Sequence, residues 1–213
     1  TATDACQNAT EHVQIITVQD TTAPTFVESL PANATVECDA VPDAAILTAA
    51  DNCGAASVSF AQTSAPGDCP NSFVITRTWT ATDACQNATE HVQIITVQDT
   101  TAPTFVESLP NDFDVTIECS QIPVAVTLSA IDSCGSATVT FDESIQQGNC
   151  ANAYIIVRTW TATDICNNVR THVQTLNVND TTAPAFVEEL PANVTLECNA
   201  VPTAATLSAT DNC

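Results

Sequence analysis

The chain repeats itself with a period of about 80 residues. The hexapeptide TATD-x-C occurs three times, at residues 1–6, 80–85 and 161–166. The pentapeptide DTTAP begins at residues 20, 99 and 180, so both motifs recur at offsets of 79 and 81 residues. Self-similarity at a fixed period is typical of chains that fold as serial copies of one small unit. The sequence therefore predicts a tandem array rather than one large domain.

The DTTAP motif sets the predicted boundaries of the repeats. Residues 20–98 and 99–179 are then two whole repeats. Residues 1–19 form the C-terminal part of a preceding repeat, and residues 180–213 form the N-terminal part of a following one. Both ends of the sequence fall inside a repeat, and the sequence lacks a signal peptide. We therefore expect it to be a window from a longer secreted chain.

Each repeat has the pattern of an all-β unit. Short stretches rich in β-branched and aromatic residues alternate with Pro, Gly, Asn and Asp, and no stretch keeps a period of 3.6 residues. The strands expected in the first whole repeat span residues 25–28, 35–38, 45–50, 56–63, 73–82 and 89–98. Strands of this length and spacing predict a β-sandwich of about 80 residues, repeated in tandem.

The charge balance excludes several classes of function. The chain has 25 Asp and Glu but only three Arg and no Lys, which gives a formal net charge of −22. A protein without a basic patch cannot displace counterions from a nucleic acid, nor bind an anionic membrane through a basic helix. No apolar run approaches the roughly 20 residues of a membrane-spanning helix. We expect neither nucleic-acid partners nor membrane insertion in this segment.

Eleven cysteines at regular intervals predict a disulfide framework formed in an oxidising compartment. Alternating strand directions would place Cys38 and Cys69 at the pole where the chain leaves a repeat. The same argument places Cys53 and Cys85 at the pole where it enters. The predicted bonds are Cys38–Cys69, Cys53–Cys85, Cys119–Cys150 and Cys134–Cys166, with partners outside this sequence for Cys6, Cys198 and Cys213. Four cysteines allow three connectivities, and the sequence alone does not choose among them.

The repeated motifs resemble a known family. Each repeat combines DTTAP with P-A-N-x-T-x-E-C, A-T-D-N-C-G or variants of these, then R-T-W-T-A-T-D-x-C-x-N and a closing V-x-D. These motifs resemble the hyalin repeat, especially its cysteine-rich form in giant surface adhesins of Bacteroidota, including gliding species. The resemblance implies an immunoglobulin-like fold, export across the outer membrane and a stalk or adhesive role. The family often has Gly where Gln86 and Asn167 stand in this sequence.

Acidic residues gather where the chain enters each repeat, and they suggest a calcium site at the repeat junctions. Ca²⁺ prefers six to eight hard oxygen ligands, which carboxylates supply. The candidate ligands are Asp20, Asp51 and Asp83, then Asp99, Asp132 and Asp164, then Asp180 and Asp211. The alternative is that these aspartates only cap turns, as Asx residues often do. Calcium is the only cofactor that the sequence suggests.

Other repeated side chains are best explained by structure. Trp79 and Trp160 alternate with Thr in predicted strands, which indicates core packing. Arg77 and Arg158 share one strand position and need either a partner such as Glu37 or Glu118, or an exposed head group. One histidine recurs per repeat, without zinc spacing, and is expected in solvent. No nucleophile motif, catalytic pair or phosphate loop occurs, so we expect no enzyme.

These features predict a non-enzymatic segment of a long fibre or adhesin, secreted to the extracellular space or the cell surface. Its partners would be neighbouring repeats, with other fibre strands or a surface glycan as further candidates. The alternative is an immunoglobulin-like module whose loops bind a glycan or protein. Asp-Thr-Thr resembles the O-glycosylation motif of Bacteroidota, so the acceptor candidates are Thr21, Thr100 and Thr181.

Overall fold

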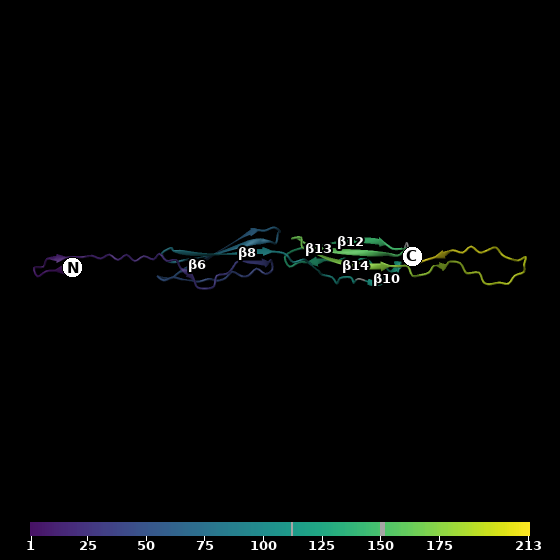
Figure 1. Cartoon of the computed structure of the whole chain (residues 1–213), viewed down its shortest axis with the longest axis horizontal. Helices are drawn as coiled ribbons and strands as arrows, with labels where there is room; N and C mark the ends of the chain where they lie inside the picture. The colour runs from purple at the N-terminus through teal and green to yellow at the C-terminus, as the bar shows by residue number, and fades with distance from the viewer. Residues whose placement is uncertain (112, 150–151) are drawn as a thin grey trace. The chain divides into compact units, whose positions relative to one another are not determined.

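A computed structural model describes residues 1–111, 113–149 and 152–213 of the chain. Residues 113–115 are described by their backbone only. The chain divides into two compact units, Thr1–Gln98 and Asp99–Cys213 (Figure 1). The regular structure of both units is almost entirely β-strand, which confirms the predicted all-β class. No helix within these ranges has the length and apolar character needed to cross a membrane.

The first unit contains one four-stranded sheet. Its order is β4 (Ala34–Glu37), β8 (Ala88–Gln98), β7 (Phe73–Thr82) and β6 (Ser57–Pro66). Strand β4 runs parallel to β8, and the other neighbours are antiparallel. Two short antiparallel pairs complete the unit: β3 (Thr25–Phe26) with β5 (Ala49–Ala50), and β1 (Ala2–Thr3) with β2 (Ala9–Thr10).

The second unit repeats this arrangement. Its sheet has the order β10 (Phe113–Ile117), β14 (Val169–Val178), β13 (Tyr154–Asp164) and β12 (Ala137–Gln147), which lie side by side in Figure 1. Strands β9 (Thr104–Phe105) and β11 (Ala130–Ile131) form a short pair, and a 3₁₀ turn η1 spans Cys119–Gln121. Residues 180–213 add a further short pair, β15 (Ala185–Phe186) with β16 (Ala209–Thr210).

The strand expected over residues 45–50 is shorter in the structure, where only Ala49–Ala50 pairs as β5. Backbone carbonyls in this region bind side chains of the sheet instead of a neighbouring strand. Trp79 Nε1 donates to Ala45 O at 3.0 Å, and Arg77 Nη2 donates to Pro42 O at 2.7 Å. The layer that faces the sheet is therefore mostly irregular, because its backbone groups are satisfied by side chains.

The core confirms the predicted role of the tryptophans. Trp79 and Trp160 are each 1% exposed, on the inner face of β7 and β13. Beside them lie one apolar cluster per unit, made of Ile75, Ile95 and Val97 in the first and Ile156, Leu176 and Val178 in the second. Alternation along β7 and β13 points every second side chain inward, which is why this face could be read from the sequence.

Neither expected environment of the buried arginines is correct. Arg158 is 4% exposed and pairs with Glu143 on the adjacent strand β12, with 2.8 Å between Nε and Oε2. Arg77 is equally buried, and its Nε donates to Gln62 Oε1 at 2.9 Å. The partner therefore comes from the paired strand rather than from the glutamate that precedes a cysteine. Carbonyls of the facing layer take up the remaining donors, such as Pro123 O for Arg158 Nη2 at 2.8 Å.

The histidines of the two sheets are half-buried rather than solvated. His91 lies 2.9 Å through Nε2 from Pro31 O, and its ring centroid is 5.9 Å from that of Trp79. His172 makes the same contacts with Pro110 O and Trp160. Each imidazole therefore covers a tryptophan and binds the turn that leads into the facing layer, so the expectation of solvent-exposed strand histidines is wrong for His91 and His172, whereas His12 is exposed.

Candidate functional site

Each described Asp-x-Cys motif forms a turn in which the aspartate fixes the position of the cysteine. The amide of Cys53 donates to Asp51 Oδ1 at 2.8 Å, and the amide of Cys213 donates to Asp211 Oδ1 at 2.9 Å. The same bond recurs at Cys6, Cys134 and Cys166. Asp side chains favour such turns because the carboxylate accepts from an amide two residues ahead. The spacing thus presents the sulfur on a closed loop.

Three aspartates meet where the chain enters each whole repeat, as the sequence predicted. Carboxylate oxygens of Asp20, Asp51 and Asp83 lie within 4.8 Å of one another. Asn87 bridges two of these segments, because its Nδ2 donates to Asp83 Oδ2 at 2.8 Å and to Asp20 O at 3.3 Å. Burial raises the pKa of Asp83, but hydrogen bonds from Asn87 and Cys85 outweigh it and hold this pKa below its ordinary value.

The second unit has the same cluster. Asp99, Asp132 and Asp164 offer oxygens within 4.8 Å of one another, and Asn168 Nδ2 donates to Asp164 Oδ2 at 2.9 Å and to Asp99 O at 3.1 Å. The two aspartates of residues 180–213 behave differently. Asp180 groups with Glu118 and Cys213, whereas Asp211 belongs to no such group in the part of the chain that the structure describes.

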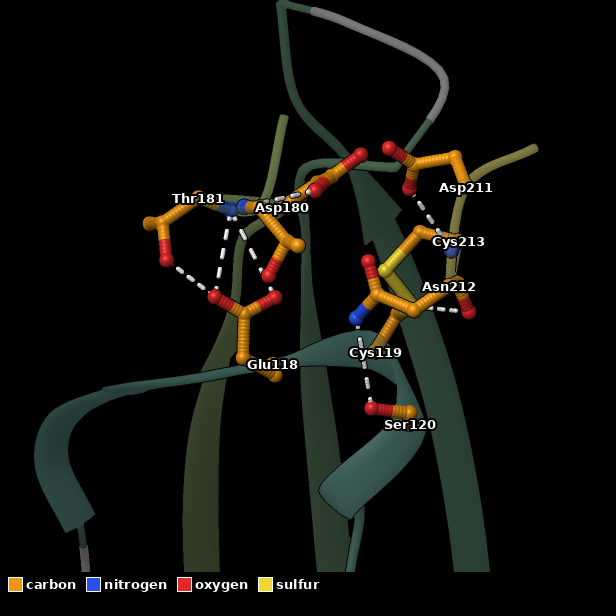
Figure 2. The surroundings of a disulfide bond; sticks show 9 residues. Glu118, Cys119, Ser120, Asp180, Thr181, Asp211, Asn212 and Cys213 are labelled. Carbon is orange, nitrogen blue, oxygen red and sulfur yellow. Dashed lines mark hydrogen bonds between the residues drawn. A yellow bond between two sulfur atoms is a disulfide. The ribbon is translucent and has the colours of Figure 1, made fainter. Parts of the chain in front are cut away.

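A disulfide joins the whole repeat 99–179 to the beginning of the next one. Cys119, at the start of η1, is bonded to Cys213 over 94 residues of sequence, with a Cα–Cα distance of 5.9 Å (Figure 2). Cys119 Sγ also lies 3.5 Å from Asn212 O, and Asn212 Nδ2 donates to Ser120 Oγ at 3.4 Å. The Asp-Asn-Cys loop that ends this sequence is therefore seated on the turn that follows β10.

Hydrogen bonds next to the disulfide hold the linker itself. Glu118 accepts from Thr181 N at 3.2 Å and from the Thr181 hydroxyl (Figure 2). Asn179 N donates to Ile117 O at 3.0 Å. Thr182 N donates to Asp180 Oδ1 at 3.1 Å. The Asp-Thr-Thr linker is thus bound to the end of β10 through both backbone and side chains.

The structure corrects several predicted disulfides. Cys119 is bonded to Cys213, so neither the Cys119–Cys150 bond nor an outside partner for Cys213 is correct; Cys150 lies outside the described residues. Cys53 and Cys85 are free and exposed, so the Cys53–Cys85 bond is also wrong. The physical reason is that the pole where the chain leaves one repeat is also where the next repeat begins, so a nearby cysteine can belong to either.

The remaining cysteines divide into two groups. Cys6 and Cys198 are free and exposed in the structure, and their outside partners stay a prediction. The four cysteines named in the other two predicted bonds all take part in disulfides: Cys38, Cys69, Cys134 and Cys166. Disulfide bonding of these four residues agrees with the predicted oxidised framework.

The acidic cluster changes the chemistry of the neighbouring thiol. The charge of Asp20 raises the pKa of Cys53, and burial and the charges of Asp51, Cys85 and Asp83 add to the effect. Five of these groups line one cavity of about 210 Å³, together with Val18, Gly54 and Ala84. Because a thiolate is disfavoured next to carboxylates, we expect Cys53 to react slowly as a nucleophile at neutral pH.

The turn after the TATD-x-C motif requires a left-handed residue. Gln86 has φ of 73° and Asn167 has φ of 68°, and Gln7 at the equivalent position has φ of 67°. These are the positions where the resembling family often has Gly, which adopts this conformation without strain. The turn keeps its geometry despite the substitution, since Asn167 N donates to Asp164 O at 3.3 Å and Asp164 N donates to Asn168 O at 3.2 Å.

The candidate glycosylation sites lie on the surface. Thr21, Thr100 and Thr181 are all exposed. The Thr181 hydroxyl donates to Glu118, so a glycan on this oxygen would replace that hydrogen bond. Modification of the three threonines stays a prediction.

Residues 26–97 match the family model described as "HYR-like domain with 4 cysteines". Over this segment the chain is similar to HYR-like domains. Together with the all-β fold and its disulfides, the match supports an immunoglobulin-like domain of the extracellular adhesion type. The matched segment lies within the first whole repeat and contains Cys38, Cys53, Cys69 and Cys85, the four cysteines that recur in residues 99–179.

Solved structures similar to the chain come from cadherins. The crystal structure of Drosophila N-cadherin EC1-4 is 16% identical, with 76% of this chain and 50% of that chain covered and a TM-score of 0.31. Protocadherin Gamma B2 extracellular cadherin domains 3–6 are 12% identical, with coverages of 88% and 55% and a TM-score of 0.28. The chain spans about half the length of these cadherin structures. No curated protein matches it.

Proposed function

We propose that the chain is a structural segment of a long extracellular fibre or adhesin and acts as a stiff, non-enzymatic stalk. The observation that carries the proposal is the Cys119–Cys213 bond, which joins a whole HYR-like repeat to the one that follows. A second covalent connection next to the main chain limits bending, because it removes freedom that a single linker would keep. Disulfides persist outside the cell, which agrees with an extracellular or cell-surface location.

Two further features support a stalk. The linker hydrogen bonds of Glu118 and Asn179 act beside the disulfide, so the joint resists twisting as well as extension. The net charge of −22 keeps neighbouring chains apart through mutual repulsion. The partners of the segment are then first of all the adjoining repeats of its own chain.

The disulfide also protects the repeat against load. When the chain is pulled at its two ends, the disulfide transmits the force directly from residue 119 to residue 213. Residues 120–212 then form a closed loop that carries no tension. A loop of this length would extend by roughly 300 Å if it were released, at about 3.4 Å per residue. Unfolding of β12, β13 and β14 therefore adds no length while the bond is intact.

Single-molecule pulling on the whole chain tests this mechanism. Cys119→Ser is expected to add an extension that the oxidised wild type does not show, because the loop opens; the disulfides of Cys134 and Cys166 keep part of this length closed unless they too are reduced. Cys198→Ser is the matched control, since Cys198 follows a glutamate as Cys119 does but is free and exposed. Equal contour lengths for wild type and Cys119→Ser would contradict the stalk mechanism. Saturable binding of a glycan or protein at the loops would favour the alternative, a ligand-binding module.

Calcium remains part of the proposal for the acidic clusters. Asp51 Oδ2 is buried and accepts no hydrogen bond from any residue the structure describes, whereas Asp51 Oδ1 holds the Cys53 turn. Asp20 and Asp83 complete the donor set, although both Asp83 oxygens already accept from Asn87. The cluster therefore offers a partial set of oxygen ligands, which solvent would complete around Ca²⁺.

We expect 10 mM Ca²⁺ to raise the melting temperature in differential scanning calorimetry, by the equivalent of about 1.4 kcal/mol for a site with a Kd near 1 mM. Bound Ca²⁺ would also neutralise the carboxylates that raise the Cys53 pKa, so alkylation of this thiol would become faster. Asp51→Asn is the matched variant, since an amide oxygen can still accept from Cys53 N. An unchanged melting temperature in Ca²⁺ would leave turn capping as the role of these aspartates.

A further inference from the structure

One segment of the sequence occurs twice, once folded into a sheet and once exposed. Residues 11–19 are identical to residues 90–98, which belong to β8. Ile95 of β8 is fully buried, whereas the equivalent Ile16 is 74% exposed and Val18 is 90% exposed. Residues 11–19 also lie outside the strands that the structure assigns. The N-terminal segment is therefore a strand sequence whose inner face is not covered.

A matching segment is exposed near the other end of the sequence. Residues 194–197 hold the position of β4, in which Ala34–Glu37 pairs in parallel with residues 95–98. Val194 is 67% exposed and Leu196 is 47% exposed, and neither lies in an assigned strand. The chain thus carries both partners of a β4–β8 pairing, and the described residues do not pair them with each other.

We propose that two copies of the chain join head to tail. Residues 194–197 of one copy pair in parallel with residues 16–19 of the next, in the register of β4 and β8. A disulfide between Cys198 of the first copy and Cys53 of the second completes the join, and both cysteines are free and exposed in the single chain. Because the two copies contribute different surfaces, each joined pair can bind a further copy at either end.

The Cys119–Cys213 disulfide supports the choice of these two sulfurs. In the repeat register, Cys198 holds the position of Cys119, and Cys53 holds the position of Cys213. Cys53 and Cys213 also lie on the same turn, since the amide of each donates to the aspartate two residues earlier. Val18 and Cys53 line one cavity of about 210 Å³. A strand that pairs with Val18 therefore brings the cysteine at its end to Cys53.

The turn that carries Cys198 is already formed in the single chain. The amide of Ala200 donates to Glu197 O at 3.0 Å, and the turn at Cys119 closes in the same way. Strand β10, which leads into Cys119, pairs in parallel with β14, which leads into the linker. The contacts that recur between two copies are those of Leu196 with Val18 and of Glu197 with Thr21.

The disulfide is what makes the join stable. Two strands without a third neighbour form a marginal sheet, so the pairing alone is weak. Oxidation removes two protons and two electrons from the two thiols, and a small disulfide such as oxidised glutathione accepts them and becomes two thiols. Joined chains are therefore expected under oxidising conditions and are expected to separate on reduction. The join does not depend on the proposed stalk role.

Two cysteine variants test the join by complementation. In a glutathione redox buffer at about 0.15 M salt, which screens the repulsion between acidic chains, the wild type is expected to form a ladder of multimers on a non-reducing gel. Cys53→Ser and Cys198→Ser are each expected to stay monomeric, because each keeps only one of the two sulfurs. Their equimolar mixture is expected to give dimers and nothing larger, with the intact mass of one copy of each variant.

Several outcomes would overturn the join. These are multimers of either variant alone, a wild type or a mixture that stays monomeric, and an internal Cys53–Cys85 bond. Cys85→Ser is the control, because Cys85 lines the same cavity as Cys53 and is also free, and it is expected to form the ladder as the wild type does.

A second pair of variants tests the strand register apart from the sulfur chemistry. Ile16→Asp in the Cys198→Ser copy is expected to lower the yield of mixed dimer by roughly tenfold, because a charge replaces a side chain that the join buries. Ile15→Asp is the matched control, since the equivalent Ile94 points to the other face of β8 and is 42% exposed. Equal yields would overturn the register. A joined chain that still extends in pulling would reject the stalk and retain the join.

Discussion

Trp160→Ala is expected to destabilise the second unit by about 3–5 kcal/mol, the usual cost of removing a buried aromatic side chain. The indole is 1% exposed, and its Nε1 donates to Val126 O at 3.0 Å. It also touches two other rings, with centroid distances of 5.1 Å to Phe141 and 5.8 Å to His172. Its removal leaves a cavity between the sheet and the facing layer, together with an unsatisfied carbonyl.

Circular dichroism during denaturation measures this effect, since it does not depend on tryptophan fluorescence. Trp160→Phe is the graded control, because it keeps an aromatic ring but loses the hydrogen bond to Val126 O, and it is expected to cost less than the alanine variant. Trp79→Ala is expected to have a similar cost in the first unit, where Trp79 is equally buried and bonds Ala45 O. A loss of less than 1 kcal/mol for Trp160→Ala would contradict the assigned core.

Arg158→Met is expected to destabilise the second unit by about 3 kcal/mol, the order found when a buried charged pair loses one partner. The side chain is 4% exposed and binds Glu143 on one side and Pro123 O on the other. Methionine fills much of the volume but satisfies neither acceptor. The loss is therefore polar in origin, in contrast to the cavity left by Trp160→Ala.

The repeat itself supplies the control for this prediction. Gln62 holds the position in the first whole repeat that Glu143 holds in the second. Its neutral amide oxygen accepts a hydrogen bond from Arg77 Nε at 2.9 Å. Glu143→Gln is therefore expected to cost less than 1 kcal/mol in urea denaturation, because the hydrogen bond survives and the carboxylate is about one-third exposed. If Glu143→Gln cost as much as Arg158→Met, the charge and not the hydrogen bonding would hold the arginine.

Local features of the sequence predicted much of the fold. Alternation along residues 73–82 identified β7 with its bounds and placed Trp79 in the core, since the side-chain period of a strand is local information. The expected strand directions predicted that Asp20, Asp51 and Asp83 lie together where the chain enters the repeat. Both predictions depend on strand direction and turn chemistry, which neighbouring residues along the chain decide.

Partners from distant strands could not be predicted in the same way. The sequence did not point to Glu143 as the partner of Arg158, because the first whole repeat has the uncharged Gln62 at the equivalent position. A comparison of the repeats therefore shows no acidic residue that recurs there. The histidines were expected in solvent, since nothing in the sequence shows that the turn at Pro31 folds over His91. Strand register brings these groups together, and register depends on pairing across the whole sheet.

The sequence by itself determined that this protein is a series of small, acidic, disulfide-containing β-units, because periodicity and side-chain alternation are properties of the linear chain. Only the tertiary structure decided which sulfur meets which. Cys119 faces Cys213 because the linker folds back onto Glu118 and the Asp211 turn presents the thiol there. Four identical cysteine positions per repeat leave that choice open until the ends of two successive repeats are positioned in space.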